Sequence, residues 1–266
     1  MESLLNDLNR SIRMLRQNPS FTITAVAALA LGIGANTAIF TVVNAVILHP
    51  LPYPDPDRIV SIAHAGAGSL NEVLFNYLAQ NDLGLTDLTA YQAGSTMNLT
   101  GVDRPERVEA TAVSRSYFQL FGAHAVLGRT FTLAEDQPGG AAVLVMSYGL
   151  WQRRFAGDSS ILEKAITLGG KPYLVVGVLA PSFYPYPQAD IWTPLQIDSS
   201  RKNLAGVLAV SARLPRGVSL AQARSRVAAI GRRSAERDPK LEVTPLQEHL
   251  TGLDRRRPKR VWAGGG

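Results

Sequence analysis

The chain of 266 residues has no cysteine and only four histidines. Without cysteine, neither a disulfide framework nor a thiolate metal site can form, and the redox compartment stays undetermined. None of the histidines has a second candidate ligand three or four residues away, so we expect no zinc and no other bound metal. The four are His49, His64, His124 and His249.

Motifs for catalysis and nucleotide binding are also missing. Gly169-Gly170-Lys171 lacks the spaced glycine of a phosphate-binding loop and precedes Pro172, so we interpret it as a turn. There is no Gly-x-Ser-x-Gly motif for a nucleophilic serine. Glu135 and Asp136 lie in a turn-like segment, where we expect solvated carboxylates. The sequence therefore predicts no catalytic residue, no cofactor-binding residue, no metal ligand and no cofactor.

Positive charge is concentrated at one end of the chain. The net charge is +6 and the isoelectric point is near 9.8. Residues 254–260 contain five basic side chains and one acidic side chain, which leaves about +2 for residues 1–253. The main part of the chain therefore has no basic face of the kind that nucleic-acid binding needs, and we expect no nucleic-acid partner.

Charged residues and histidine are absent from Phe21 to Leu48. A helix of this length measures about 42 Å, which exceeds the roughly 30 Å of bilayer hydrocarbon. One alternative is a signal peptide, whose apolar region spans only about 7–15 residues. Another is a buried helix of a soluble protein, which rarely runs this far without a polar face. The pattern favours a transmembrane helix over 21–48.

Residues 1–20 are predicted to form a cytoplasmic amphipathic segment. Its leucine and isoleucine residues recur three or four apart between polar ones, which predicts a helix. This helix either lies in the membrane interface against anionic lipid or packs on a neighbouring helix. Three arginines precede the predicted span, and only Arg58 occurs in the fifteen residues after it. The positive-inside rule therefore places the N-terminus in the cytoplasm and the main domain outside.

Small residues inside the predicted span, such as Gly32 and Gly34, indicate that other membrane helices pack against it. Residues 49–253 follow as one extracytoplasmic domain, entered through a proline-rich connector over 49–57. Strands and helices are mixed there without a regular βαβ order, which predicts an α+β fold.

Local signals place the elements of this domain. A Gly169-Gly170 turn predicts a hairpin, and serines at the starts of apolar-periodic segments predict helix caps. The predicted strands are 58–63, 141–146, 166–168, 173–179, 207–214 and 241–246, with looser strands before Thr111 and turns at Gly94, Gly101 and Arg104-Pro105. The predicted helices follow a Ser69–Glu72 capping box, Ser114, Ser147 and Ser219, the last helix ending at Asp238-Pro239, and a proline-rich loop covers 181–194.

Seven stretches, in order, resemble the MacB/FtsX-type permease subunits, particularly large duplicated permeases with a MacB-like periplasmic core domain. The resemblance runs from about Leu8 to Leu253. The stretches are LALGIGANTAIF with its exit VVNAVILHPLPYPDPDRIV, YFQLFGAHAVLGRTFT, VLVMSYGLWQRRFAGD, ITLGGKPYLVVGVLAPSF, DIWTPL and RLPRGVSLAQAR.

The resemblance implies the N-terminal portion of an ABC-type transporter permease of the efflux or force-transmitting type, which is not itself an enzyme. It implies a location in the inner membrane with a periplasmic main domain. It also implies three partners: a separate ATPase subunit, other permease helices or a second permease copy, and membrane lipid. The alternative is a membrane-anchored extracytoplasmic enzyme or binding domain.

The last residues depart from the family pattern. The family continues from a segment like VTPLQEHLTG into a second hydrophobic span, whereas residues 254–266 are basic and end in three glycines. We expect a disordered, non-native tail over 254–266, produced by a frame shift or by fragmentation.

Overall fold

A computed structural model describes most of the chain, which divides into two compact units, Met1–Pro50 and Leu51–Gly266. The amphipathic helix expected over 1–17 and the tail expected over 254–266 lie outside the described residues. The described ranges are 19–43, 52–101, 104–198, 207–234 and 240–250.

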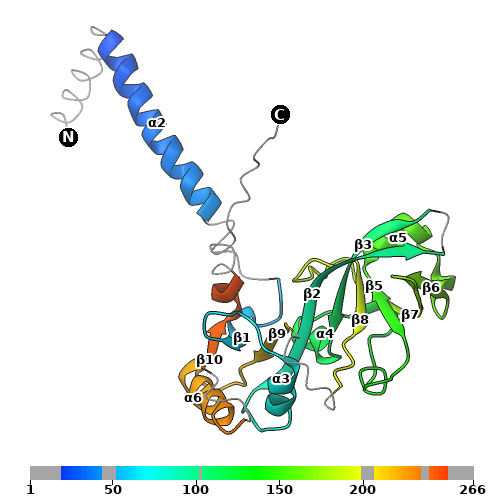
Figure 1. Cartoon of the computed structure of the whole chain (residues 1–266). Coiled ribbons are helices and arrows are strands. Elements are labelled where there is room, and N and C mark those ends of the chain that lie inside the picture. Colours follow the sequence, from blue (N-terminus) through cyan, green and yellow to red (C-terminus); the bar gives the residue numbers. More distant parts are fainter. Residues whose placement is uncertain (1–18, 44–51, 102–103, 199–206, 235–239, 251–266) are drawn as a thin grey trace, which may run out of the picture. The chain divides into compact units, whose positions relative to one another are not determined.

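The described part of the first unit is one helix, α2 (Pro19–Val43) (Figure 1). Pro19 is its first described residue. Large apolar side chains along it are exposed, including Leu29 and Leu31. Among the described residues, no helix combines the length and the apolarity that crossing a membrane requires. The final part of the predicted span, 44–48, lies outside the described residues.

The second unit contains a mixed sheet with short helices, which is the α+β fold expected from the sequence. The strands are β1 (Ile59–His64), β2 (Thr86–Thr100), β3 (Glu106–Val113), β4 (Ala125–Gly128), β5 (Val143–Met146), β6 (Ala165–Leu168), β7 (Lys171–Leu179), β8 (Ile191–Pro194), β9 (Ala209–Arg213) and β10 (Leu241–Pro245). The helices are η2 (Pro56–Arg58), α3 (Glu72–Ala79), α4 (Ser116–Leu120), α5 (Tyr148–Phe155), η3 (Ser159–Ile161) and α6 (Leu220–Gly231).

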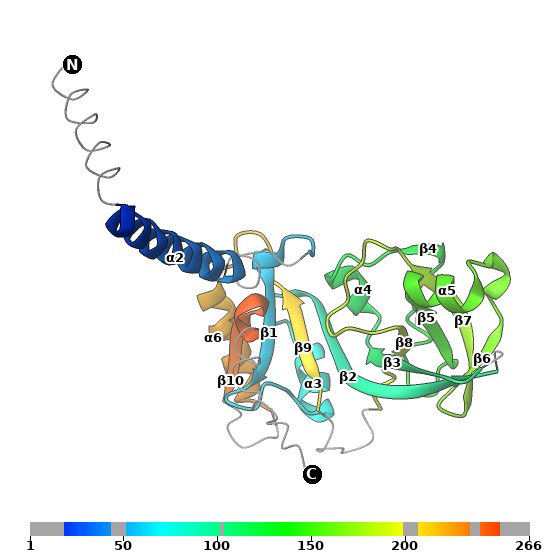
Figure 2. The same cartoon turned by 90° about the horizontal axis from the view of Figure 1, so that it is seen from above.

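Within the described residues, all ten strands join into one sheet in the order β10-β1-β9-β2-β3-β8-β5-β7-β4, with β6 beside β2 and β7. The β3–β8 and β5–β7 pairs are parallel, and the other pairs are antiparallel. Figure 2 shows that this sheet forms two lobes. Lobe 1 contains β10, β1, β9 and the start of β2, and lobe 2 contains the rest of β2 with β3 to β8.

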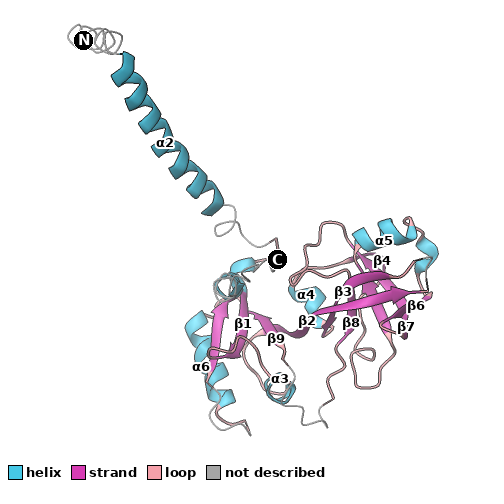
Figure 3. Cartoon of the chain, turned by 45° about the horizontal axis from the view of Figure 1, so that its top comes forward, coloured by secondary structure: helices cyan, strands magenta, loops and turns pink. Residues whose placement is uncertain are grey.

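Each lobe has its own apolar core. Figure 3 shows α3 and α6 beside the strands of lobe 1, and α5 beside the strands of lobe 2. The lobe 1 core includes Ile62, Leu74 and Val227, and the lobe 2 core includes Leu144 and Leu150. A third group, the central cluster, takes side chains from both lobes and from α4. Its largest members are Tyr53, Tyr91, Tyr117, Phe118, Phe121, Phe131 and Trp192.

Strand β2 passes from one lobe into the other. Its first half, from Thr86 to Tyr91, pairs with β9 of lobe 1, and its second half pairs with β3 as far as Leu99. A bulge interrupts the register between Gln92 and Ser95. The turn expected at Gly94 is wrong, because this residue, with φ +89°, lies in the bulge of one continuous strand.

Two of the four expected serine caps are confirmed. Ser147 accepts a hydrogen bond from the N–H of Leu150 at 3.1 Å, and Ser219 forms a reciprocal capping box with Gln222. The Ser69–Glu72 box is wrong, because Asn71 caps α3 by accepting from the N–H of Leu74.

The expected Ser114 cap is wrong, because the Ser114 side chain bonds to a distant strand. Its Oγ lies 2.7 Å from Thr89 Oγ1 and accepts from the N–H of Ala90 at 3.1 Å, both in β2. It also lies 3.2 Å from Ser116 Oγ in α4, but it caps no backbone N–H of that helix. The Gly169-Gly170 hairpin is confirmed, since both glycines have positive φ between β6 and β7.

Other boundaries differ from expectation because they depend on distant partners. The loop expected over 181–194 contains β8, whose pairing with β3 joins residues far apart in sequence. Helix α6 ends at Gly231, ahead of the expected stop at Asp238-Pro239, and residues 235–239 lie outside the described part.

Candidate functional site

The described part of the connector, residues 52–57, enters the second unit at the central cluster. Tyr53 is 7% exposed and packs edge-on against Phe121, with ring centroids 4.9 Å apart. Pro54 lies against Gly122, which has φ +70° and ends the helical turn of α4. A Cβ at position 122 would lie 2.5 Å from Pro54 Cγ, so only glycine allows this close approach. The connector is therefore seated on α4.

Arg213, at the end of β9, binds the connector from the other side. Its Nη1 donates to the carbonyl of Pro54 at 2.7 Å, and its Nη2 donates to the carbonyl of Leu120 in α4. Its Nε donates to Asp87 Oδ2 at 3.4 Å, which forms an ion pair. One guanidinium thus joins the connector, α4, β9 and the start of β2, and its five donors in a fixed fork suit this task.

The ion pair between Arg213 and Asp87 is largely buried. The side chains of Arg213 and Asp87 are 14% and 17% exposed. Asp87 has φ +53°, a left-handed conformation that costs a non-glycine residue about 1 kcal/mol or more. The ion pair holds this conformation in place. We name Tyr53, Pro54, Asp87, Leu120, Gly122 and Arg213 together the connector junction.

Two further contacts reinforce the connector junction. The N–H of Leu214 donates to the carbonyl of Arg58 at 2.8 Å, and Arg58 Nη2 donates back to the carbonyl of Leu214. Directly after β10, Leu246 is fully buried in the central cluster, and Leu250 packs against that cluster. The segments before β1 and after β10 therefore reach the same apolar cluster.

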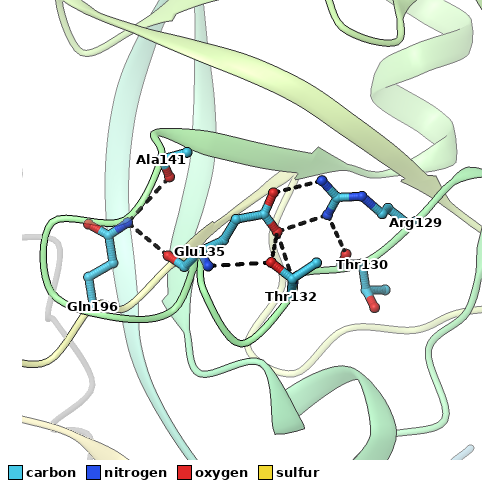
Figure 4. Close-up of polar contacts among 6 residues, drawn as sticks. All are labelled: Arg129, Thr130, Thr132, Glu135, Ala141 and Gln196. Atoms are coloured by element: carbon cyan, nitrogen blue, oxygen red, sulfur yellow. Dashed lines mark hydrogen bonds and ion pairs between the residues drawn. The ribbon is translucent and has the colours of Figure 1, made fainter.

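A second polar group lies in lobe 2, in the segment 129–142 that we name the strap (Figure 4). Arg129 donates to both carboxylate oxygens of Glu135, at 2.8 and 2.7 Å. The N–H and hydroxyl of Thr132 donate to the same carboxylate at 2.8 and 2.9 Å. These charge-assisted bonds lower the pKa of Glu135 to about 2, chiefly through Arg129. The expectation of a solvated carboxylate is wrong here, because Glu135 is only 7% exposed.

The strap also binds the crossing segment, residues 195–197, which follows β8. Gln196 Nε2 donates to the carbonyl of Glu135 at 2.9 Å and to that of Ala141 at 3.3 Å. Asp136 accepts from the N–H of Arg115 at 2.8 Å and from the N–H of Gln196 at 3.5 Å. Burial raises the pKa of Asp136 despite these bonds, so this carboxylate is not freely solvated either.

The histidines are not brought together. His64 ends β1, His124 is exposed next to β4, His249 lies in the helical residues 246–250, and His49 is outside the described part. Over the described ranges, no three histidine, aspartate or glutamate side chains are grouped so that they could hold a metal ion. The expectation of no catalytic residue, cofactor or metal remains a prediction.

Sequence reasoning missed the connector junction. Proline-rich residues 49–57 indicated a stiff connector but not where it binds. The one available signal was Arg213, a charged residue ending an otherwise small and apolar strand. Its partners, Pro54, Asp87 and Leu120, are 93 to 159 residues away in sequence, so no local pattern identifies them.

Comparison with known proteins gives a consistent match. A family model described as the MacB-like periplasmic core domain matches residues 22–230. The periplasmic region of MacB from Actinobacillus actinomycetemcomitans has 15% identity and a TM-score of 0.57, covering 78% of this chain and 96% of that structure.

Two other solved structures are similar. A domain of a putative permease protein from Porphyromonas gingivalis has 17% identity and a TM-score of 0.55, covering 73% of this chain and 91% of that one. The extracellular domain of the noncanonic ABC-type transporter YknZ from Gram-positive bacteria has 18% identity and a TM-score of 0.55, and the match covers 70% of this chain and 99% of that structure. A search of curated protein sequences found no match.

Proposed function

The chain belongs to the family of MacB-like periplasmic core domains, and on this premise we propose that it is the N-terminal portion of an ABC-type transporter permease. In this proposal it is not an enzyme. A separate ATPase subunit hydrolyses ATP, and this chain transmits the resulting movement to its extracytoplasmic domain. The names of the similar structures, which include a permease protein and an ABC-type transporter, support this assignment.

The connector junction is the observation that carries the proposal. Movement of the connector reaches the folded domain at residues 53–54. There Tyr53 packs on Phe121, the Pro54 ring lies against Gly122, and the Pro54 carbonyl accepts from Arg213. Packed interiors transmit displacement because they are dense and resist compression. Since Arg213 also binds α4 and β2, a displacement of Pro54 is passed on to both lobes.

The proposal places residues 21–48 in the inner membrane, with 1–20 in the cytoplasm and 49–253 outside. Its support is the lack of any charged residue or histidine over 21–48, together with the exposed apolar side chains of α2. Such side chains need lipid or other helices around them. Membrane lipid and further permease helices, or a second permease copy, are the partners that this arrangement requires.

Co-purification from membranes in mild detergent tests the assignment. We expect a nucleotide-hydrolysing subunit to accompany the chain. Isolation without one would favour the alternative of a membrane-anchored enzyme or binding domain and would refute the permease.

The transmission path has its own test in the same complex. ATP is expected to change amide hydrogen exchange in β1 and β9 by about threefold or more. The change in β9 should be reduced in Arg213→Ala, because the connector then loses its side-chain bond to β9, while the bonds between Arg58 and Leu214 remain. Retention of the full ATP response in Arg213→Ala would contradict the path through this residue.

A disulfide provides the matched control. The Cβ positions at residues 54 and 122 lie 4.0 Å apart, within the range of about 3.5–4.5 Å found in disulfides. Because the chain has no cysteine, Pro54→Cys with Gly122→Cys introduces a single possible pair. Pro54→Cys also removes the Cγ and Cδ atoms that exclude a Cβ at position 122, which leaves the left-handed conformation of residue 122 as a cost of about 1 kcal/mol. In the Arg213→Ala background the oxidised pair rejoins the connector to residue 122 after α4 but not to β9, so the response of β9 should stay reduced in both the oxidised and the reduced pair. Full recovery in the oxidised pair would show that the path to β9 does not need Arg213.

A further inference from the structure

The lobes are connected at two backbone crossings in the described residues. One is β2 at its bulge, where Gly94 has φ +89°. The other is the crossing segment, where Gln196 has φ +49° and the neighbouring Leu195 and Ile197 pack against the lobe 1 core. Both crossings therefore contain a residue in the left-handed region, which is sparsely populated by most residues and common where a chain bends.

The strap is held to lobe 2 by strong bonds. The Arg129–Glu135 pair is bidentate, and Thr132 adds two more donors to the same carboxylate. The backbones of the strap and β7 also approach closely, since a Cβ at Gly177 would lie 2.1 Å from the carbonyl oxygen of Arg129. The strap is thus a fixed part of lobe 2.

Its bonds to Gln196 are weaker. The crossing segment is also bonded to β3, from the N–H of Leu195 to the carbonyl of Val113 at 3.0 Å, and this bond does not depend on the Gln196 side chain. The Gln196 amide makes two neutral hydrogen bonds, at 2.9 and 3.3 Å, and the bond from its N–H to Asp136 is 3.5 Å long. A neutral hydrogen bond contributes about 1 kcal/mol, roughly half of a charge-assisted one. If the strap and the crossing segment separate, the break will occur at Gln196 and will leave the Arg129–Glu135 pair intact.

We propose that the strap is a catch for a hinge between the two lobes. With Gln196 bound, the crossing segment is fixed and the lobes keep one orientation. With Gln196 released, lobe 2 rotates relative to lobe 1 about the two crossings, over the small range that the remaining bonds of Arg213 to Leu120 and of Leu195 to Val113 allow. The central cluster takes side chains from both lobes, so the lobes stay in contact while they rotate. This device goes beyond the proposed function, because it requires neither an ATPase nor a transported substrate.

Distance measurements between one spin label in each lobe test the catch in the full chain. Ser225→Cys on α6 and Gln152→Cys on α5 provide the label sites, since both residues are exposed and the chain has no other cysteine. In Gln196→Ala we expect the width of the distance distribution to increase by about twofold. An unchanged distribution would overturn the proposal.

Two further variants separate the catch from general loss of structure. Gln196→Gly removes the same two side-chain bonds but accepts φ +49° without strain, so it should fold and should broaden the distribution as Gln196→Ala does. Thr96→Val removes a side-chain bond of 2.9 Å to Glu109 inside lobe 2 and should leave the distribution unchanged. Equal broadening in Thr96→Val, or none in Gln196→Gly, would refute the catch.

Discussion

Two neighbouring carboxylates in the strap have opposite pKa shifts because they have different partners. Glu135 meets Arg129 and both donors of Thr132, so its ionised form is stabilised. Asp136 accepts backbone N–H groups but has no arginine side chain bonded to it, and burial is the larger effect. Ionised Glu135 therefore stabilises the fold, whereas the raised pKa of Asp136 means that its ionisation opposes folding.

The acid sensitivity of the fold follows from the Glu135 shift. Its pKa falls from 4.5 to about 2 on folding, so its contribution is complete above about pH 4.5 and disappears as pH falls through 2. Because the Arg129 side chain is 50% exposed and screened, we expect about 2 kcal/mol at pH 7. Urea unfolding of Glu135→Gln and the unsubstituted chain between pH 7 and 2 measures this. A difference independent of pH would show that the ion pair is not responsible.

At helix α3, two variants can distinguish the Ser69 cap predicted from the sequence from the Asn71 cap found in the structure. Asn71 Oδ1 accepts from the N–H of Leu74 at 2.8 Å. We expect Asn71→Ala to lower the free energy of unfolding by about 1 kcal/mol. Ser69→Ala should change it by less than about 0.5 kcal/mol. Thermal or urea unfolding of the two variants checks this, and equal losses would restore the predicted Ser69 capping box.

Elements with local causes could be predicted from the sequence. Helix α5 begins after its Ser147 cap and the β6–β7 hairpin turns at two glycines, and both signals lie inside the element itself. Strand β8 could not be predicted, because its four residues are strand only through pairing with β3 and β5. The connector junction was missed for the same reason. The ion pair of the strap, by contrast, has local partners: Thr132 and Arg129 lie three and six residues before Glu135, so this interaction could have been predicted from the sequence.

At the scale of the whole chain, the charge distribution predicts an orientation. Arginines precede residues 21–48, whereas only Arg58 follows closely. By the positive-inside rule, a reporter fused before Asn18 should be active in the cytoplasm and one fused after Leu253 should be active outside. Protease added from outside should reach residues 181–194 before the inner membrane is breached. Cleavage only after breaching that membrane would contradict this orientation.

The sheet order also determines when each lobe can be completed during synthesis. Strand β1 ends at residue 64, but its two neighbours, β9 and β10, begin at residues 209 and 241. The strands that lobe 2 adds, β3 to β8, all lie between residues 106 and 194, so they are made first. Both edges of β1 therefore stay unpaired while the whole of lobe 2 is produced, and an unpaired apolar edge can bind other chains. The length of lobe 2 thus determines how long the nascent lobe 1 depends on protection from aggregation.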